Sequence, residues 1–159
     1  DRIESRGLGD VYKRQMLNTV VRQIAFFEFE KRIHDQRKIK ELSVNEICKI
    51  WIDVQKQSLG PSIKFNDDYK YFWSYIPHFI HSPFYVYAYA FGDCLVNSLY
   101  NVYESKLSKF EDKYISLLES GGSDTYDKLL KPFGLNPKKK DFWQKGVNVI
   151  NDLIDQLEE

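Results

Sequence analysis

Residues 76–89 read Ile-Pro-His-Phe-Ile-His-Ser-Pro-Phe-Tyr-Val-Tyr-Ala-Tyr, and this stretch decides the fold class. Its second half, residues 84–89, alternates with a period of two and is rich in β-favouring residues, which is typical of a strand. Ser82 and Pro83 point the other way, because they fit the N-cap and first position of a helix. The apolar run also continues beyond residue 89. We therefore predict a helix from Pro83 to about Tyr103, and with it an all-α fold.

Apolar residues at helical spacing predict two helices ahead of this stretch, one over residues 17–38 and one from Ser43 to Gly60. Ser43 can accept a hydrogen bond from the amide of Glu46, whose side chain can reach back to the Ser43 amide. This pairing is a capping box. The predicted apolar faces are Val20, Val21, Ile24, Phe27 and Ile33 in the first helix, and Ile47, Ile50, Trp51 and Val54 in the second.

Turn signals divide the remaining chain into shorter helices. The aromatic patch at residues 69–76 predicts one short helix, and Pro77 turns the chain. Further helices are predicted at residues 107–119, at residues 123–131 after a Gly-Gly break, and at residues 141–157. The predicted core positions of the last helix are Phe142, Val149, Ile150, Leu153 and Leu157.

The composition fits one domain and excludes some partners. A chain of 159 residues with 43% hydrophobic and 29% charged residues is ordinary for a globular protein. Its 23 basic and 23 acidic side chains cancel, whereas nucleic-acid binders carry a basic surplus. No apolar run approaches the roughly 18 residues of a membrane span. We expect no nucleic-acid partner and no membrane partner. The aromatic content of 16% is high and is typical of a large core or a binding surface.

The two cysteines lie far apart in apolar helical patterns and form no metal-binding spacing. We interpret Cys48 and Cys94 as reduced, buried thiols of a cytoplasmic protein, although the sequence leaves a disulfide open. Gly92 lies inside the predicted central helix, where glycine costs about 1 kcal/mol relative to alanine. Its presence there suggests close packing.

Residues 1–15 have no helical or strand period and give way abruptly to the first amphipathic helix. They resemble translated linker sequence that recurs at the ends of metagenomic reading frames. We therefore interpret residues 1–15 as a non-native, linker-like segment and expect the native sequence to begin near Met16 or Leu17. We also expect the parent protein to extend further upstream.

Several separated blocks resemble, in order, the C-terminal part of the oligoendopeptidase F family, zinc metallopeptidases of the thimet-oligopeptidase-like superfamily. The blocks are Asn18–Gln23, Phe27–Glu30, Trp73–Phe79, Pro83–Tyr87, Leu117–Ser123, Phe133–Leu135 and Asp141–Trp143. The resemblance covers essentially residues 17–159. It implies that residues 16–159 are the C-terminal part of an all-helical metallopeptidase domain with a deep channel, which cuts short peptides.

The resemblance also implies one zinc ion, held by the two histidines of an HExxH helix and a further glutamate, with the HExxH glutamate as general base. This sequence contains no HExxH, because none of His34, His78 and His81 is followed by that pattern. We therefore expect the zinc ligands and the general base upstream of Met16. The partners implied are an oligopeptide substrate and the missing N-terminal part of the same domain, and the chain alone should be inactive.

In the family pattern, a histidine and tyrosines complete the site from the wall opposite the zinc. The resemblance makes His78 and Tyr85 the catalytic residues, as donors to the substrate backbone and the oxyanion, and Tyr87 and Tyr89 the substrate-binding residues. In a helix from Pro83, Tyr85 and Tyr89 share a face while Tyr87 points elsewhere. The alternative is structural: a histidine satisfied by a backbone carbonyl, and core tyrosines with bonded hydroxyls.

Two histidines are predicted to be peripheral to this site. His81 fits the N-terminal end of a helix better than a ligand position, and His34 should be exposed on the long first helix. The competing functional class is a non-catalytic helical module that binds a partner through its aromatic surface. A third possibility is that the fragment is never made as a separate protein.

Overall fold

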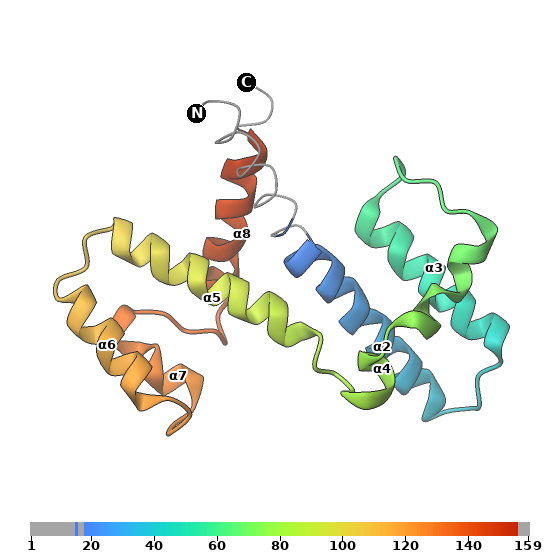
Figure 1. Cartoon of the computed structure of the whole chain (residues 1–159), viewed down its shortest axis with the longest axis horizontal. Helices are drawn as coiled ribbons and strands as arrows, with labels where there is room; N and C mark the ends of the chain where they lie inside the picture. Colours follow the sequence, from blue (N-terminus) through green and yellow to red (C-terminus); the bar gives the residue numbers. More distant parts are fainter. Residues whose placement is uncertain (1–14, 16–17, 156–159) are drawn as a thin grey trace. The chain divides into compact units, whose positions relative to one another are not determined.

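The computed structural model describes Gln15 and residues 18–155, except for the side chains of residues 150, 153 and 154. Every regular element in this part is helical and none is a strand, so the all-α prediction is confirmed (Figure 1). The described chain forms two compact units, residues 18–91 and residues 92–155. None of the described helices has the length and apolarity that crossing a membrane requires. The segment predicted to be linker-like, residues 1–15, lies outside the described residues except for Gln15.

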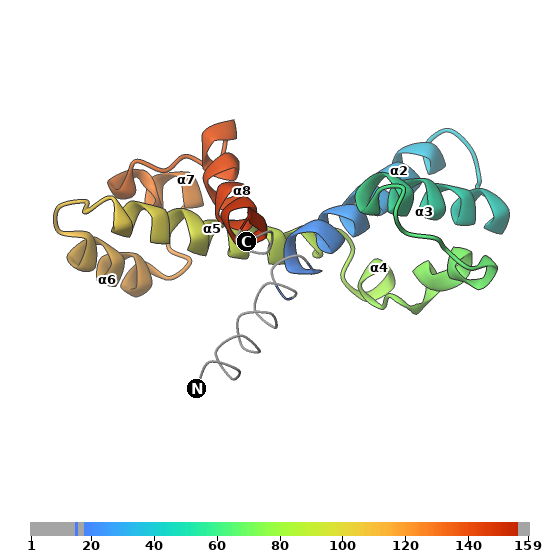
Figure 2. The same cartoon turned by 90° about the horizontal axis from the view of Figure 1, so that it is seen from above.

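The first unit is built on two long helices that lie side by side (Figure 1). Its elements are the π-helical turn η1 (Asn18–Arg22), α2 (Gln23–Arg37), α3 (Val44–Leu59), the 3-10 helix η2 (Asp67–Tyr75), α4 (His78–His81) and the first turn of α5 (Tyr87–Glu104). Figure 2 shows η2 and α4 on the same side of the α2–α3 pair. The helices predicted over residues 17–38 and 43–60 are therefore confirmed, with a π-helical first turn.

Aromatic rings fill the interface between α2 and α3. Trp51 is fully buried, and its ring centroid lies 5.0 Å from that of Phe29 and 5.6 Å from that of Phe26. The indole Nε1 of Trp51 donates to the Tyr69 carbonyl at 3.0 Å, which fixes η2 against α3. The predicted burial of Trp51 is confirmed, as is that of Ile50 and Val54.

The predicted apolar face of the first helix is partly wrong. Val20 is buried as expected, but Ile24 is 50% exposed. The residues that α2 buries are instead Ala25, Phe26, Phe29 and Glu30. Because the largest rings gain most from burial, Phe26 and Phe29 set the rotation of α2 and turn Ile24 outward.

Local caps fix the ends of α3 as the sequence predicts. The Ser43 hydroxyl accepts from the Glu46 amide at 3.4 Å, and the Glu46 carboxylate accepts from the Ser43 amide at 2.8 Å. Gly60 ends the helix with a φ of 72°, in the region that glycine enters most readily. Ile76, the residue before Pro77, is extended, as that position requires.

The helix predicted from Pro83 begins four residues later. Ser82 is the C-cap of α4 rather than an N-cap, and α5 starts only at Tyr87. Between them Phe84 has a φ of 60°, and its N–H donates to the Glu30 carboxylate at 2.9 Å. A left-handed residue cannot lie inside an α-helix, so this contact with α2 overrides the local Ser-Pro signal.

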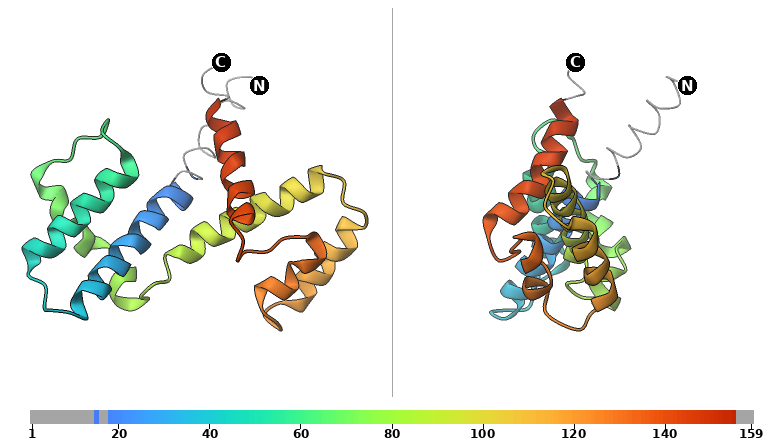
Figure 3. Two further views of the ribbon diagram at one scale, coloured as in Figure 1. Left: turned by 180° about the vertical axis from the view of Figure 1, so that it is seen from behind. Right: turned by 90° about the vertical axis from the view of Figure 1, so that its left-hand side faces the viewer.

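The second unit contains the rest of α5 and the C-terminal helices. These are α6 (Phe110–Ser120), α7 (Tyr126–Leu129), the 3-10 helix η3 (Lys131–Phe133) and α8 (Lys140–Asp155), and α8 crosses α5 (Figure 3). The predicted breaks and helices all occur, with ends shifted by a few residues. Phe142 is buried, and its carbonyl accepts from the Ser98 hydroxyl at 3.1 Å. Val149 is half-buried, whereas Leu157 and the side chains of Ile150 and Leu153 lie outside the described part.

Both cysteines are buried and free, as predicted. The indole Nε1 of Trp73 donates to Cys48 Sγ at 3.4 Å. Burial raises the pKa of the Cys94 thiol to about 11, and the charge of Asp93 adds to this effect. The Cys94 thiol therefore contributes to packing in its neutral form.

The close approach predicted at Gly92 occurs instead at Gly146. A Cβ at Gly146 would lie 2.9 Å from Cys94 Cβ and 3.0 Å from Cys94 Cα, whereas a Cβ at Gly92 meets nothing within 4 Å. Glycine at position 146 therefore allows α8 to approach α5 closely, and Gly92 has no such role.

The two glycines provide a matched test of this packing. Gly146→Ala should destabilise the chain by about 1–3 kcal/mol, because the added methyl group overlaps the α5 backbone. Gly92→Ala should instead stabilise it by up to about 1 kcal/mol through helix propensity. Urea unfolding followed by circular dichroism measures both. Equal effects at the two positions would contradict the assigned contact.

The capping box of α3 should make stability depend on acid pH. Hydrogen bonds from the Lys40 ammonium and from the Ser43 amide and hydroxyl lower the pKa of Glu46 from 4.5 to about 2. Because the folded pKa is depressed, this stabilisation is present above the unfolded value and is lost as pH falls from 4.5 toward 2. Glu46→Gln keeps a neutral capping partner, so its melting temperature should fall less over this range. Glu41→Gln, an exposed change outside the box, is the control and should behave like the wild type.

Candidate active site: a histidine and tyrosine cluster

Three of the four predicted site residues come together in the first unit. His78 begins α4, Tyr85 lies in the turn before α5, and Tyr89 lies in the first turn of α5. His78 Nε2 is 3.2 Å from the Tyr89 hydroxyl. The His78 and Tyr85 rings are nearly parallel, with centroids 6.4 Å apart, and the Tyr85 and Tyr89 rings are perpendicular at 5.6 Å. We call His78, Tyr85 and Tyr89 the donor cluster.

The side chains of the donor cluster are partly or largely exposed in this chain. Tyr85 is 53% exposed, Tyr89 is 41% exposed and His78 is partly buried. A phenol remains an O–H donor up to about pH 10, and an imidazole can offer a second donor. The cluster therefore brings together groups that can donate hydrogen bonds, of which His78 and Tyr89 are bonded to each other. Tyr85 and Tyr89 are not buried in this chain, and the choice between a structural and a catalytic role stays a prediction.

Tyr87 lies apart from the donor cluster. Its ring packs edge-on against Phe27 of α2, with centroids 5.8 Å apart. The prediction that Tyr87 points away from Tyr85 and Tyr89 is confirmed, although Tyr85 precedes the helix instead of lying in it. The substrate-binding role predicted for Tyr87 stays a prediction.

The donor cluster is anchored by apolar neighbours in the sequence. Phe79 follows His78 and packs against Phe29, with ring centroids 5.1 Å apart. Val86 lies between Tyr85 and Tyr87 and is fully buried. His78 and Tyr85 therefore each border a side chain that packs in the core, which restricts their backbone.

The two peripheral histidines are exposed, as predicted. His81 nevertheless occupies the last position of α4, not the start of a helix, because the turn at residues 82–86 separates the two helices. The His34 ring contacts Phe84, with centroids 4.7 Å apart. His34 therefore supports the turn that carries Tyr85.

Glu30 is the site residue that sequence reasoning missed. It is only 2% exposed, on the buried face of α2, and one of its carboxylate oxygens accepts the Phe84 N–H. Burial raises the pKa of Glu30, against the opposing effects of the Phe84 hydrogen bond and the charges of His34 and His78. The sequence signal was its position next to Phe29, on the face of α2 that packs inward.

The described residues do not fit a zinc site. No group of three or more histidine, cysteine, aspartate or glutamate side chains in this part of the chain is arranged to hold a metal ion. The donor cluster contributes one imidazole and two phenols, a set without the carboxylate or second imidazole of a typical zinc site.

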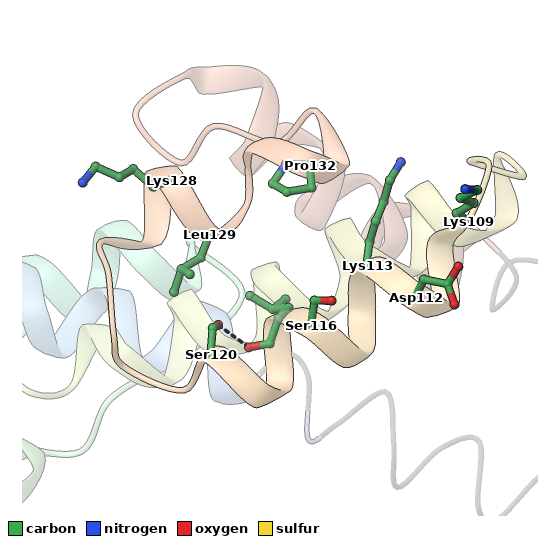
Figure 4. Close-up of a pocket in the computed structure, with 9 residues that line it drawn as sticks. Lys109, Asp112, Lys113, Ser116, Ser120, Lys128, Leu129 and Pro132 are labelled. Carbon is green, nitrogen blue, oxygen red and sulfur yellow. Dashed lines mark hydrogen bonds between the residues drawn. The ribbon is translucent and has the colours of Figure 1, made fainter.

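A cavity in the second unit has no comparable chemistry. It measures about 420 Å³ and lies between α6 and the α7–η3 segment (Figure 4). Its Ser120 hydroxyl donates to the Leu117 carbonyl at 2.6 Å, and Lys128 pairs with Asp124 at 2.9 Å. Lys128 also points away from the other lining residues in Figure 4. Ser120 and Lys128 are thus bonded to neighbours on their own segments, and we place the candidate site at the donor cluster.

A family model named peptidase family M3 matches residues 9–149, a range that includes the whole donor cluster. The chain belongs to peptidase family M3. The resemblance found in the sequence is therefore confirmed at the level of the family.

The relatives of this M3 chain are longer oligopeptidases. It is 32% identical over 143 residues to an oligoendopeptidase F homolog of Borreliella burgdorferi, and 28% identical over 142 residues to oligopeptidase PepF of Bacillus subtilis. Each match covers 89% of this chain but only 24% and 21% of the relative. The chain therefore spans about a quarter of the length of the curated relatives that it matches.

A solved structure also matches this chain over only part of its own length. The M3 chain superposes on the crystal structure of a "putative peptidase" from Chlamydophila abortus with a TM-score of 0.79 and 28% identity. The match covers 90% of this chain and 24% of that one. The all-α arrangement is thus that of one part of a larger peptidase fold.

The arrangement of the donor cluster can be tested on the 159-residue chain. Nuclear Overhauser cross-peaks should connect the His78 ring protons with those of Tyr85 and Tyr89, because the rings lie within 6.4 Å of one another, centroid to centroid. Tyr87 should instead show cross-peaks to Phe27. Cross-peaks from His78 to Tyr87 would contradict the assignment of the cluster.

Proposed function

We propose that this M3 chain forms the oxyanion-binding wall of a zinc metalloendopeptidase that hydrolyses oligopeptides. The observation that supports this proposal is the convergence of an imidazole and two phenols on one accessible surface, in a chain of this family. Tyr85 donates to the oxyanion of the tetrahedral intermediate, and His78 donates to the substrate backbone or the same oxyanion. Tyr89 orients His78 through their hydrogen bond and, with Tyr87, contacts the substrate.

The chemistry favours hydrogen-bond donors at this wall. Negative charge grows on the scissile carbonyl oxygen as water adds, so a hydrogen bond to that oxygen is stronger in the transition state than in the bound substrate. Donors already held in place stabilise this charge without reorganising. The anchoring of the donor cluster by Phe79 and Val86 supplies this preorganisation.

In this proposal, the zinc ligands and the general base are supplied by residues outside this chain. The described residues offer no zinc site, and the sequence has no HExxH. We propose that the zinc ligands and the glutamate base are encoded upstream of Met16, and that this chain alone does not cleave peptides.

The missing N-terminal part of the same domain is the proposed protein partner. The first unit leaves large apolar side chains exposed, among them Tyr75 and Ile80. Exposed apolar surface of this kind is typical of an interface, and the matched relatives are about four times longer than this chain. We propose a cytoplasmic enzyme, because free buried thiols such as Cys48 and Cys94 are usual in reducing compartments.

The complete gene gives the first test. It should encode an HExxH helix upstream of this segment, and its product should bind zinc and cleave a quenched oligopeptide, whereas the 159-residue chain should do neither. A complete gene without HExxH would reject the enzyme and leave the non-catalytic aromatic interaction module. Sequencing genomic DNA across the Gln15–Met16 junction also tests whether residues 1–15 are native.

Tyr85→Phe tests the proposed oxyanion donor in the complete protein. Loss of one preorganised donor should lower kcat by about 100- to 1000-fold, with a much smaller change in KM. Tyr71→Phe removes the hydroxyl of an exposed tyrosine on η2 and is the matched control. If both variants keep full kcat in an active enzyme, Tyr85 is not the donor.

A further inference from the structure

Glu30 has an unusual environment for a charged residue. It is 2% exposed, and one carboxylate oxygen, Oε2, is buried without a hydrogen-bond partner in the described structure. The other oxygen, Oε1, accepts the Phe84 N–H at 2.9 Å. Burying a carboxylate with an unsatisfied oxygen is unfavourable compared with burying an apolar side chain of similar size. The stability of the fold therefore does not account for Glu30.

The partner of Glu30 is strained. Phe84 has a φ of 60°, a left-handed conformation that is unfavourable for an aromatic residue. The turn that contains Phe84 is exposed at Ser82, Pro83 and Tyr85, so water could satisfy its amide without any help from α2. The hydrogen bond from the Phe84 amide to an oxygen of the buried Glu30 side chain is the interaction that holds this conformation.

Three residues on one face of α2 contact Phe84, in the turn between α4 and α5. Phe27 contacts the Phe84 ring at 6.1 Å, Glu30 takes the Phe84 N–H, and His34 contacts the same ring at 4.7 Å. These three residues are at positions i, i+3 and i+7, on one side of the helix. Residue 84 is thus fixed through both its backbone and its side chain.

We propose that Glu30 is a positioning residue, whose buried carboxylate holds the Phe84 turn and thereby sets Tyr85 against His78. Tyr85 follows Phe84 directly, so its ring direction depends on the backbone that Glu30 fixes. The effect on catalysis rests on the proposed function of the donor cluster, whereas the effect on geometry does not.

Two substitutions separate geometry from charge. Glu30→Met has nearly the same shape and removes the acceptor, whereas Glu30→Gln keeps an acceptor oxygen and removes the charge. In the 159-residue chain, Glu30→Met should increase the exchange rate of the Phe84 amide by about tenfold or more and weaken the cross-peaks between His78 and Tyr85. Glu30→Gln should preserve both signals.

The same variants in the complete protein report on catalysis. Glu30→Met should lower kcat by about 10- to 100-fold, since small displacements of a catalytic group have effects of this size. KM should change little and the melting temperature should not fall. Glu30→Gln should retain most of the kcat. A role in stability alone would instead lower the melting temperature of Glu30→Met together with its activity.

The outcomes distinguish this inference from the proposed function. If Glu30→Met leaves the Phe84 amide and the His78–Tyr85 cross-peaks unchanged, or if both variants lose kcat equally, the positioning role is wrong. If Glu30→Met disturbs the geometry in the chain but an active complete enzyme keeps its kcat, the positioning role stands and the oxyanion role of the donor cluster fails. If Glu30→Met does not fold, hydrogen exchange of the Phe84 amide is measured in the wild-type chain instead. Exchange slower than that of an unprotected amide supports the hydrogen bond to Glu30, and exchange at the unprotected rate overturns the inference.

Discussion

The hydrogen bond from the Phe84 amide to the buried carboxylate of Glu30 is the constraint on which the candidate site depends. It links residues 54 positions apart in sequence and holds Phe84 in a left-handed conformation. A helix cannot pass through such a residue. The chain therefore leaves α4 at Ser82, turns, and enters α5 only at Tyr87. This turn gives Tyr85 a direction that a continuous helix would not provide.

The aromatic core beneath the turn gives the constraint its rigidity. A helix of four residues such as α4 has no stability of its own in water. It is held because Phe79 packs on Phe29 and Phe26, which also surround Trp51. His78 and Tyr85 are thus each followed in the sequence by an apolar residue of the core, Phe79 and Val86. A site of this kind gains precise placement from the core while its polar atoms remain accessible.

Local signals predicted most of the fold correctly. The Ser43–Glu46 capping box, the Gly60 end and the extended residue before Pro77 depend on neighbours within four residues, and each occurs as expected. The Ser82–Pro83 pair is a local signal of the same kind, and it predicted a helix start at Pro83. The hydrogen bond between Phe84 and Glu30 of α2 prevents a helix from starting there. The rotation of α2 and the close approach at Gly146 were also missed, because both are decided by packing against another helix.

The sequence by itself determined the all-α class and the order of the helices, which follow from residue types and spacings along the chain. The resemblance to the oligoendopeptidase F family, carried by separated sequence blocks, predicted the family and named His78, Tyr85, Tyr87 and Tyr89 as site residues. Only the tertiary structure decided that His78, Tyr85 and Tyr89 lie together, whereas Tyr87 packs against Phe27. It also decided that Glu30 accepts a hydrogen bond from the turn that carries Tyr85. The physical reason is that a buried carboxylate and a strained backbone are stable only where segments distant in sequence contact each other. The spacing of residues along the chain does not show which distant segments are in contact.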